Sequence, residues 1–211
     1  MAQFRGRGPN PRATMQTVAI RKIAQMGEPV LRQVARDLTL VELRSPAIQT
    51  LIDDMIETMH DADGAGLAAP QVYESIQLCV IELNKNPRYP DAPEIPLTIL
   101  ANPVVTSTVE NPADALTDEN SILMYEGCLS VTGLRGQVRR PRQVSVQALD
   151  RFGVPLAFTW AGVMASVVQH ETDHLNGMLY VDRVDPKSLT FLREYERYVP
   201  REARVIDKGA E

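Results

Sequence analysis

Apolar residues recur at helical spacing between positions 46 and 59, which predicts an amphipathic helix. Ser45 precedes the stripe as an N-cap, and Pro46 occupies the first helical position, where a missing N–H costs little. We interpret the stripe as core packing; it consists of Ile48, Leu51, Ile52, Met55, Ile56 and Met59. A shorter helix is expected over residues 29–36.

Segments rich in strand-forming residues follow in the middle of the chain. Residues 77–83 predict one strand, and residues 97–100 begin another that we expect to stop at Asn102 and Pro103. Residues 143–149 alternate, with Val144, Val146 and Ala148 on one face, which is typical of a half-buried strand. The turn residues 150–153 then lead into residues 154–159, so the two segments predict a β-hairpin.

A second strong helical pattern lies near the C-terminal end. Residues 160–168 form an apolar run without proline, which we interpret as the buried first half of a helix that Gly177 can end. A last amphipathic helix is expected over residues 186–199, with Leu189, Leu192 and Tyr195 on one side. The order of helices, strands and a helix predicts an α+β fold, with antiparallel sheets around a central helix and a C-terminal helix.

The chain of 211 residues predicts one domain over residues 18–211, ending in a polar tail. Residues 1–17 contain three arginines, no acidic residue and several glycines and prolines, so we expect a disordered extension. An Arg-rich transit peptide for an organelle is the alternative. Residues 85–96 contain four prolines and predict an extended surface loop.

Composition narrows the functional classes. A net charge of −5 and a pI of about 5.3 do not favour broad nucleic-acid binding, and we expect no specific DNA partner. Because no apolar run is long enough to span a bilayer, no membrane partner is expected either. Cys79 and Cys128 could form one disulfide, but the composition fits free thiols in a reducing cytosol at least as well.

The clearest chemical signal is the pattern H-E-x-x-H at residues 170–174. On a helix, His170 and His174 are one turn apart on the same face, so their imidazoles can bind one metal ion. Glu171 then lies beside the ion, where it can handle the proton of an activated water. A catalytic site of this kind also needs a third protein ligand.

Cys128 is the natural candidate for that ligand, because a thiolate with two imidazoles is a known set for first-row metals. The alternative is a nucleophilic cysteine served by a histidine, which leaves the two-histidine pattern unexplained. Upstream, the small residues 64–70 either let a backbone approach another group closely or form only a tight turn. Gln71 adds a polar side chain to this loop, and taken alone it would be interpreted as structural.

Three motifs, in this order, carry a resemblance to a known family. They are GAGLAAPQ at residues 64–71, EGCLS at residues 126–130 and QHETDHL at residues 169–175. Together they resemble the signature motifs of the peptide deformylases at every fixed position, and the resemblance extends over about residues 18–198. It implies an α+β fold with the metal helix at its centre. It also implies hydrolytic removal of the formyl group from the N-formylmethionine of newly synthesised proteins, with release of formate.

The resemblance implies that Cys128, His170 and His174 hold the ion and that Glu171 takes the proton from the attacking water and passes it to the leaving amine. It implies Fe²⁺ as the physiological ion, with Zn²⁺, Ni²⁺ or Co²⁺ able to replace it in purified protein. The implied partners are N-formylmethionyl nascent peptides and, transiently, the ribosome. The implied location is the bacterial cytoplasm.

The same resemblance implies how the substrate is held. The family's oxyanion donors fall on the side chain of Gln71 and the backbone N–H of Leu129. Gly66 is expected to lie along the peptide backbone of the substrate. The residues expected to line the methionine pocket are Ala65, Val163, Ser166 and Val167.

Two further features concern the surroundings of the ion. Asp173 is a candidate partner for a metal-binding histidine, or only a solvated helix charge. Glu126 and Arg135 resemble a structural ion pair of the family.

Two hypotheses from other functional classes remain open at this point. A zincin-type endopeptidase shares H-E-x-x-H but usually takes its third ligand from beyond the helix, where no third histidine or suitable partner is found, although Asp182 and Asp185 could be tried. A non-catalytic binding protein with a vestigial site is the other, although intact Gln71, Cys128 and Glu171 argue against it.

Overall fold

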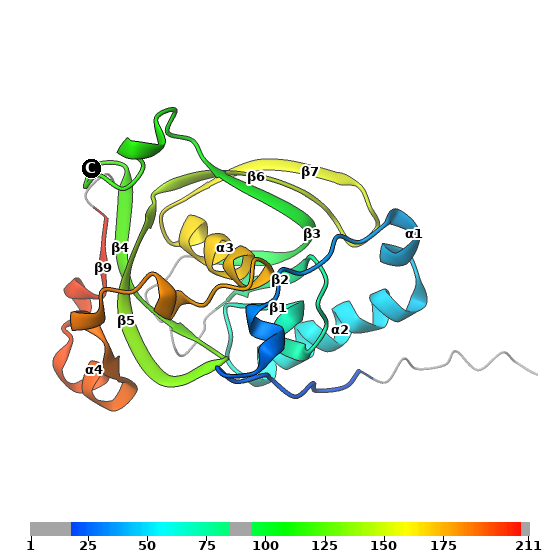
Figure 1. Ribbon diagram of the computed structural model, residues 1–211, viewed down its shortest axis with the longest axis horizontal. Helices are drawn as coiled ribbons and strands as arrows, with labels where there is room; N and C mark the ends of the chain where they lie inside the picture. The colour runs from blue at the N-terminus through cyan, green and yellow to red at the C-terminus, as the bar shows by residue number, and fades with distance from the viewer. Residues whose placement is uncertain (1–17, 85–93, 208–211) are drawn as a thin grey trace, which may run out of the picture.

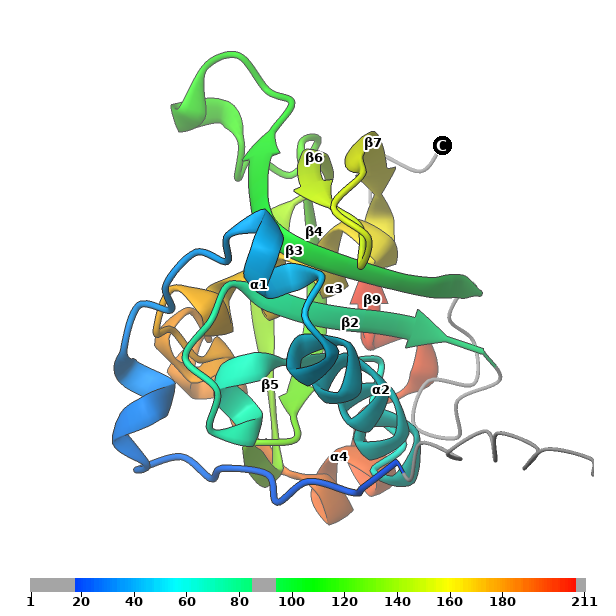
Figure 2. The ribbon, with the colours of Figure 1, turned by 90° about the vertical axis from the view of Figure 1, so that its right-hand side faces the viewer.

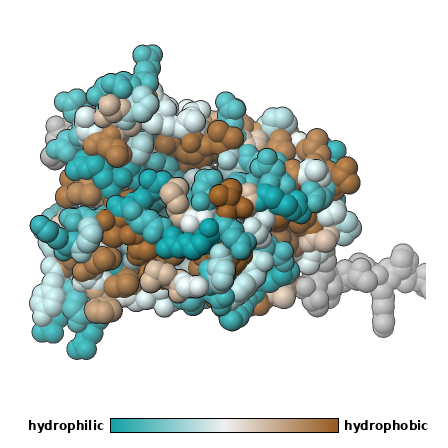
Figure 3. All heavy atoms as spheres, viewed as in Figure 1, coloured by the Kyte–Doolittle hydropathy of each residue, from teal (hydrophilic) through white to brown (hydrophobic). Residues whose placement is uncertain are grey.

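The computed structural model of the protein describes residues 18–84 and 94–207. The expectations for residues 1–17 and for residues 85–93 of the proline-rich loop lie outside the described residues, as does the end of the polar tail. Ile95 and Pro96, which the sequence pattern assigns to that loop, instead begin a strand. Within the described ranges, no helix is both long and apolar enough to cross a membrane. On the face shown in Figure 3, hydrophilic and hydrophobic residues are interspersed.

Two antiparallel sheets form the framework of the fold (Figure 1). The larger sheet has the order β1-β2-β3-β6-β7 and the smaller one the order β8-β5-β4-β9. The strands are β1 (Gly66–Ala68), β2 (Leu78–Leu83), β3 (Ile95–Ser107), β4 (Ser121–Cys128), β5 (Val131–Pro141), β6 (Gln143–Leu149), β7 (Pro155–Ala161), β8 (Thr190–Phe191) and β9 (Val205–Ile206).

The helices surround and fill this framework. The α-helices are α1 (Leu40–Leu43), α2 (Pro46–Asp61), α3 (Gly162–Leu175) and α4 (Leu192–Tyr198). Short 3₁₀ turns connect them: η1 (Pro29–Arg32), η2 (Ala69–Val72), η3 (Pro112–Asp114), η4 (Tyr180–Asp182), η5 (Pro186–Ser188) and η6 (Arg201–Ala203). In Figure 1, α3 lies in the middle of the molecule, and it contacts strands of both sheets. The expected α+β fold, with a central helix and a C-terminal helix, is therefore confirmed.

Helix α2 confirms the apolar stripe of the sequence. Ser45 caps it by accepting a hydrogen bond from the backbone N–H of Ile48, and Pro46 is its first residue. Met55 and Met59 are fully buried, in a core cluster shared with residues of β1 and β2. Figure 2 shows α2 next to β2. Each fully buried side chain of this size contributes about 1.5–3 kcal/mol, so packing rather than helix propensity holds α2 in place.

Strand β2 separates two parts of the core. Val80 faces the α2 side, whereas Cys79 and Ile81 face the α3 side, together with Ala165 and Val168 of α3. A strand buried on both faces needs a continuous apolar run, which explains why residues 78–81 lack polar positions. Cys79 and Cys128 are both free thiols, so no disulfide joins them.

Strand β3 does not stop at Asn102 and Pro103, contrary to expectation. It continues to Ser107, and its pairing irregularity lies between Ala101 and Val104. Asn102 has a φ of +50°, a left-handed conformation that asparagine tolerates better than most residues. Its side chain accepts a hydrogen bond from the N–H of Leu38 at 2.8 Å and donates one to the carbonyl of Leu38 at 2.8 Å. The residue therefore makes a bulge, which allows β3 to pair with β2 through its first part and with β6 through its last part.

Three predicted helices also need correction. Helix α3 begins at Gly162 rather than near Trp160, because Trp160 pairs with Val144 in the β6–β7 hairpin. The hairpin itself is confirmed. The helix expected over residues 186–199 is divided into η5, β8 and α4, because Phe191 pairs with Leu134 of β5. The helix expected over residues 29–36 is only the 3₁₀ turn η1.

The bulge at Asn102 yields a testable prediction. Asn102→Ala should lower the free energy of unfolding by about 2–4 kcal/mol, because it removes two hydrogen bonds and places a Cβ-bearing residue without a local polar contact at positive φ. Asn102→Gly should cost about 1 kcal/mol less, because glycine accepts this φ freely. Urea unfolding of the three proteins measures both effects. Equal stability of the alanine variant and the wild type would contradict the bulge argument.

Candidate functional site

Helix α3 positions the two histidines and the intervening glutamate in its C-terminal half. Ala165 and Val168 fix the first half of the helix against the larger sheet. The helix ends at Leu175, and Gly177 follows with a φ of +72°, as expected for a residue just beyond a helix C-terminus. The rings of His170 and His174 lie edge to face with centroids 5.0 Å apart, so both imidazoles project from one side of the helix.

Cys128 is the last residue of β4 and brings the smaller sheet to this side of α3. Its Sγ lies 3.2 Å from Nε2 of His174, and it accepts a hydrogen bond from the backbone N–H of Ser130 at 3.3 Å. The ligand atoms of Cys128, His170 and His174 all lie within 4.8 Å of one another. This donor set and its spacing fit a single first-row metal ion.

The electrostatics of the cluster favour a thiolate. Burial alone would raise the pKa of the Cys128 thiol, but His174 and His170 outweigh burial and hold its pKa well below the usual value. Burial likewise disfavours a charged His170, yet Cys128 and Glu126 raise the pKa of this histidine well above its usual value. These shifts favour a protonated histidine beside a thiolate. A metal cation would take the place of the proton at these donors.

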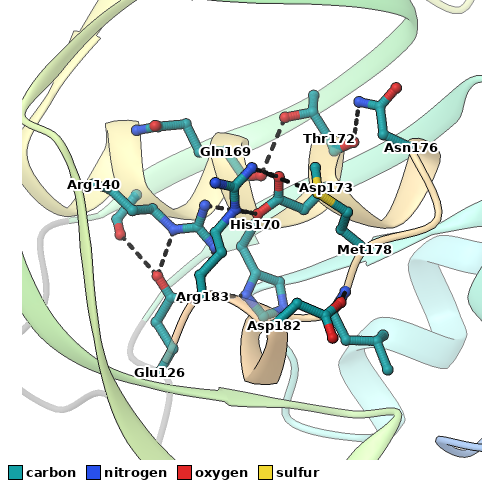
Figure 4. Close-up of polar contacts among 12 residues, drawn as sticks. Glu126, Arg140, Gln169, His170, Thr172, Asp173, Asn176, Met178, Asp182 and Arg183 are labelled. Carbon is teal, nitrogen blue, oxygen red and sulfur yellow. Dashed lines mark hydrogen bonds and ion pairs between the residues drawn. The ribbon is translucent and has the colours of Figure 1, made fainter. Parts of the chain in front are cut away.

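A buried carboxylate orients one of the two histidines. Glu126, two residues before Cys128 on β4, accepts a hydrogen bond at 2.9 Å from Nδ1 of His170 when that nitrogen carries the proton. Arg140 of β5 donates to the same carboxylate through Nε at 2.6 Å and Nη2 at 3.0 Å. Burial disfavours the charged form of Glu126, but Arg140 and His170 hold its pKa well below the usual value. Glu126 and both of these partners are drawn in Figure 4.

The same network continues onto the outer side of α3 (Figure 4). Asp173 accepts hydrogen bonds at 2.8 Å from Nη1 of Arg140, and from Nε and Nη2 of Arg183. Asp173 thus acts on the histidines only through Arg140 and Glu126, and it is not the direct histidine partner that the sequence suggests. The expected pair of Glu126 with Arg135 is wrong as well, since Glu126 pairs with Arg140.

Glu171 is buried in the cleft beside the ligand cluster. Its Oε2 has no hydrogen-bond partner among the described residues. Burial raises the pKa of this carboxyl to about 7, although His170 and His174 act in the opposite direction. A Cβ on Gly66 would lie 2.4 Å from Oε1 of Glu171, so only glycine leaves room for this carboxylate. The Glu171 carboxyl can therefore both accept and donate a proton near neutral pH.

Gln71 of η2 also contacts this cluster. Its Oε1 accepts a hydrogen bond from the N–H of Ala68 at 2.8 Å, which fixes the amide orientation. Its Nε2 donates to Oγ of Ser130 at 3.1 Å and to Sγ of Cys128 at 3.5 Å. The side chain is therefore a buried and oriented hydrogen-bond donor at the ligand cluster rather than part of an isolated turn.

Residues of the ligand cluster and the residues that are expected to contact the substrate line the same cleft. Its lining includes His170, Cys128, Glu171 and Gln71. It also includes all five expected substrate-contacting residues and Leu129, together with β4 residues: Ala65, Gly66, Val163, Ser166, Val167, Leu129, Met124 and Tyr125. The structure therefore brings the three sequence motifs together around a largely apolar cleft.

The residues that a zincin would use do not reach the cluster. Asp182 pairs with Arg32 and accepts a hydrogen bond from the N–H of Leu179 at 2.8 Å. Asp185 caps η5 by accepting from the N–H of Lys187 at 3.0 Å. The third donor beside the two histidines is thus Cys128.

Comparison with known proteins decides among the classes that share these residues. Residues 20–189 match the sequence model of the family described as polypeptide deformylase. The chain belongs to this family. Peptide deformylase 1 of Nitrosomonas europaea is 40% identical over 166 residues, which cover 79% of this chain and 88% of the relative. Peptide deformylase 2 of Pseudomonas putida is 44% identical over 165 residues, which cover 78% of this chain and 88% of the relative.

Solved structures agree with the sequence comparison. A class I type b peptide deformylase from Acinetobacter baumannii, bound to Met-Ala-Ser, has a TM-score of 0.70 and 38% identity, and the match covers 81% of this chain and 100% of that chain. A peptide deformylase from Legionella pneumophila has a TM-score of 0.64 and 39% identity, covering 81% of this chain and 89% of that chain. Peptide deformylases are metalloenzymes that hydrolyse the formyl amide of N-formylmethionine, and this is the function of the present chain.

Sequence reasoning missed two contributors to this deformylase site. Ser130 contacts both Gln71 and Cys128, and its place in the EGCLS motif was the available signal. Arg140 lies at the centre of the buried charge network, but Arg139, Arg140 and Arg142 are close together in sequence. No feature of the sequence distinguishes the one whose side chain turns inward.

The network predicts an unequal effect of neighbouring arginines. Arg140→Met should lower the free energy of unfolding by about 3–5 kcal/mol, because it leaves the buried Glu126 carboxylate without its cation. Arg139→Met is the matched control, since its pair with the exposed Asp118 should contribute less than about 1 kcal/mol. Urea unfolding measures the difference, provided that the unfolding free energy depends equally steeply on urea concentration in each protein. Similar losses in the two variants would show that the buried network does not hold the site together.

Proposed function

We propose that Cys128, His170 and His174 hold one divalent cation and that Glu171 moves the protons of the deformylation reaction. The observation that carries this proposal is the unpartnered Glu171 carboxylate in the same cleft as three converging metal donors. A formamide is a weak electrophile, and the bound cation supplies Lewis-acid activation of the attacking water and of the formyl carbonyl.

Glu171 has the properties that such a proton carrier needs. In its ionised form, Oε2 accepts a proton from the water that attacks the formyl carbon. The same carboxyl then donates the proton to the nitrogen of the leaving amine, so that formate and a free N-terminus are released. A carboxyl pKa near 7 suits both steps, because neither protonation state is strongly disfavoured at neutral pH.

Gln71 and Leu129 are proposed to bind the oxyanion that develops on the formyl oxygen. The Nε2 of Gln71 already points toward Cys128, and the Ala68 N–H holds the amide in that orientation. The backbone N–H of Leu129 comes from the residue directly after Cys128, so it belongs to the same edge of the cleft. Losing one such donor typically costs about 3–4 kcal/mol of transition-state stabilisation.

The apolar part of the cleft is proposed to select methionine. Gly66 offers backbone without a side chain beside the substrate's own backbone. The pocket for the methionine side chain consists of Ala65, Val163, Ser166 and Val167. The binding of Met-Ala-Ser by the Acinetobacter baumannii relative supports a peptide in this place. A missing methylene costs about 1–3 kcal/mol in such pockets, so formyl-Met peptides should be preferred over formyl-Gly peptides.

We further propose iron(II) as the physiological ion, with zinc, nickel or cobalt able to replace it, because the donor set alone does not select one first-row metal. Residues 18–211 would act as one catalytic domain, which the family match over residues 20–189 supports. The bacterial relatives and the nature of the substrate support work in the bacterial cytoplasm, with transient contact to the ribosome.

Formate release from formyl-Met-Ala-Ser tests the role of Glu171. Glu171→Gln should retain the metal, because the three donors are untouched, and should lose about 10²–10⁴-fold in kcat, because proton transfer is removed. Metal content is measured alongside formate release in anaerobically prepared protein. Glu119→Gln, at an exposed position, is the matched control. Near-wild-type turnover by a fully metallated Glu171→Gln protein would refute the proposed role.

Cys128 is tested by metal content rather than by activity alone. Cys128→Ala should lose the metal, whereas Cys79→Ala, which removes the other buried thiol, should retain it. In cobalt-substituted protein, a sulfur-to-metal charge-transfer absorption should be present in the wild type and in Cys79→Ala. A Cys128→Ala protein that is fully metallated and active would show that the sulfur is not a ligand.

A further inference from the structure

The cleft that contains the proposed methionine pocket has two walls, and they come from different parts of the fold. One wall is β4 from Met124 to Gly127, and the other is the first half of α3, including Val163 and Val167. Near the metal donors, Ser166 of α3 joins the walls by donating a hydrogen bond to Oε1 of Glu126 at 3.3 Å. Val163 lies in the first turn of α3, and a second connection joins the walls near this turn.

That connection is the last described segment of the chain, residues 204–207, which we call the C-terminal strap. Its strand β9 pairs with β4 through Val205 opposite Met124. The N–H of Tyr125 donates a hydrogen bond to the carbonyl of Arg204 at 2.9 Å. Residues opposite one another in an antiparallel pair share a face, so Val205 lies on the same face of the sheet as the pocket residue Met124. Asp207 follows β9 directly.

Asp207 fastens the strap to the beginning of α3. Its Oδ1 accepts a hydrogen bond from Nε of Arg142 at 2.5 Å. The carbonyl of Arg142 in turn accepts the N–H of Gly162, the first residue of α3, at 2.8 Å. A Cβ built on Gly162 would lie 3.5 Å from Oδ2 of Asp207, so the carboxylate rests against the helix start. A negative charge is favourable there, because the helix N-terminus carries a partial positive charge.

The outer face of the smaller sheet fixes the other end of the strap. The guanidinium of Arg204 lies 4.7 Å from the ring centroid of Tyr195 on α4. Tyr195 also packs against Tyr125 of β4, with ring centroids 5.2 Å apart. Arg204 is therefore held by α4 and β4 together. This contact fixes which residues of β9 pair with β4, and it places Asp207 beside Arg142.

We propose that the C-terminal strap is a specificity-determining element and that Asp207 is the positioning residue that fixes the width of the methionine pocket. The strap touches both walls, so it sets the separation of Met124 from the first turn of α3. Asp207 does not line the cleft and acts only through Arg142, Gly162 and β9. This inference rests on the proposed methionine pocket. Because the side chains of Arg142 and Asp207 are 27% and 18% exposed, removing their pair should alter the local geometry without unfolding the protein.

The test compares two single variants that each neutralise one acid of a partly exposed ion pair. Asp207→Asn weakens the fastening of the strap. Asp53→Asn is the matched control, because Asp53 pairs with Arg151 at 2.8 Å with similar exposure, on α2 and away from the cleft lining. Initial rates of formate release from formyl-Met-Ala-Ser and formyl-Ala-Ala-Ser give kcat and KM for each protein. Metal content and thermal stability are measured on the same samples.

For Asp207→Asn we expect KM for formyl-Met-Ala-Ser to rise about three- to tenfold, with kcat within about twofold of the wild type. The preference for formyl-Met over formyl-Ala should fall by a similar factor, because a looser wall contacts the methionine side chain less well. Metal content should stay unchanged. Asp207→Glu keeps the charge and should recover most of the preference. Asp53→Asn should match the wild type in every measurement.

Two outcomes would overturn the strap proposal. The first is an Asp207→Asn protein whose KM and preference equal those of Asp53→Asn. The second is a fall in kcat that follows loss of metal at unchanged preference, which would mean a merely structural role. Failure of the proposed function is distinguishable from both, because it would appear in the wild type as absence of formate release from formyl-Met-Ala-Ser.

Discussion

The site depends on the buried charge network of Glu126, Arg140 and Asp173, which joins β4, β5 and α3. Each of these charges would be costly to bury alone, so the three elements are stable in this arrangement only when the charges meet. Glu126 precedes Cys128 by two residues, and Asp173 precedes His174 by one. The pairing therefore brings the sulfur donor and the imidazole donors to one place before any ion binds.

The two histidines are held by different means. Glu126 bonds to Nδ1 of His170, which leaves Nε2 as the donor toward an ion and increases its basicity. Nδ1 of His174 has no hydrogen-bond partner among the described residues, and this side chain is held by packing at 1% exposure. One ligand is thus oriented by charge and the other by close packing. The network also favours the thiolate of Cys128 indirectly, because Glu126 helps to raise the pKa of His170, and His174 and His170 lower the pKa of the thiol.

Glu171 shows how the same environment produces opposite effects on neighbouring groups. Glu126 and Cys128 are held in their charged forms by close partners, whereas Glu171 faces the cleft and is dominated by burial, which raises its pKa to about 7. The close approach of Gly66 contributes, because this glycine backbone packs directly against the carboxylate and limits access of water. The GAGLAAPQ motif therefore supports the chemistry through its lack of side chains as well as through Gln71.

The sequence by itself determined the features that depend on local periodicity. The four-residue spacing of His170 and His174 required one helix face, and the stripe from Ile48 to Met59 required a buried one. The three motifs, read together, were enough to indicate the cleft residues and the family. Tertiary structure decided what depends on strand register. Glu126 pairs with Arg140 rather than Arg135 because these arginines differ by an odd number of positions along β5 and so face opposite sides of the sheet. The start of α3, the division of the C-terminal helix and the two-residue strand β9 likewise follow from pairing with distant strands, which leaves no periodic signal in so short a segment.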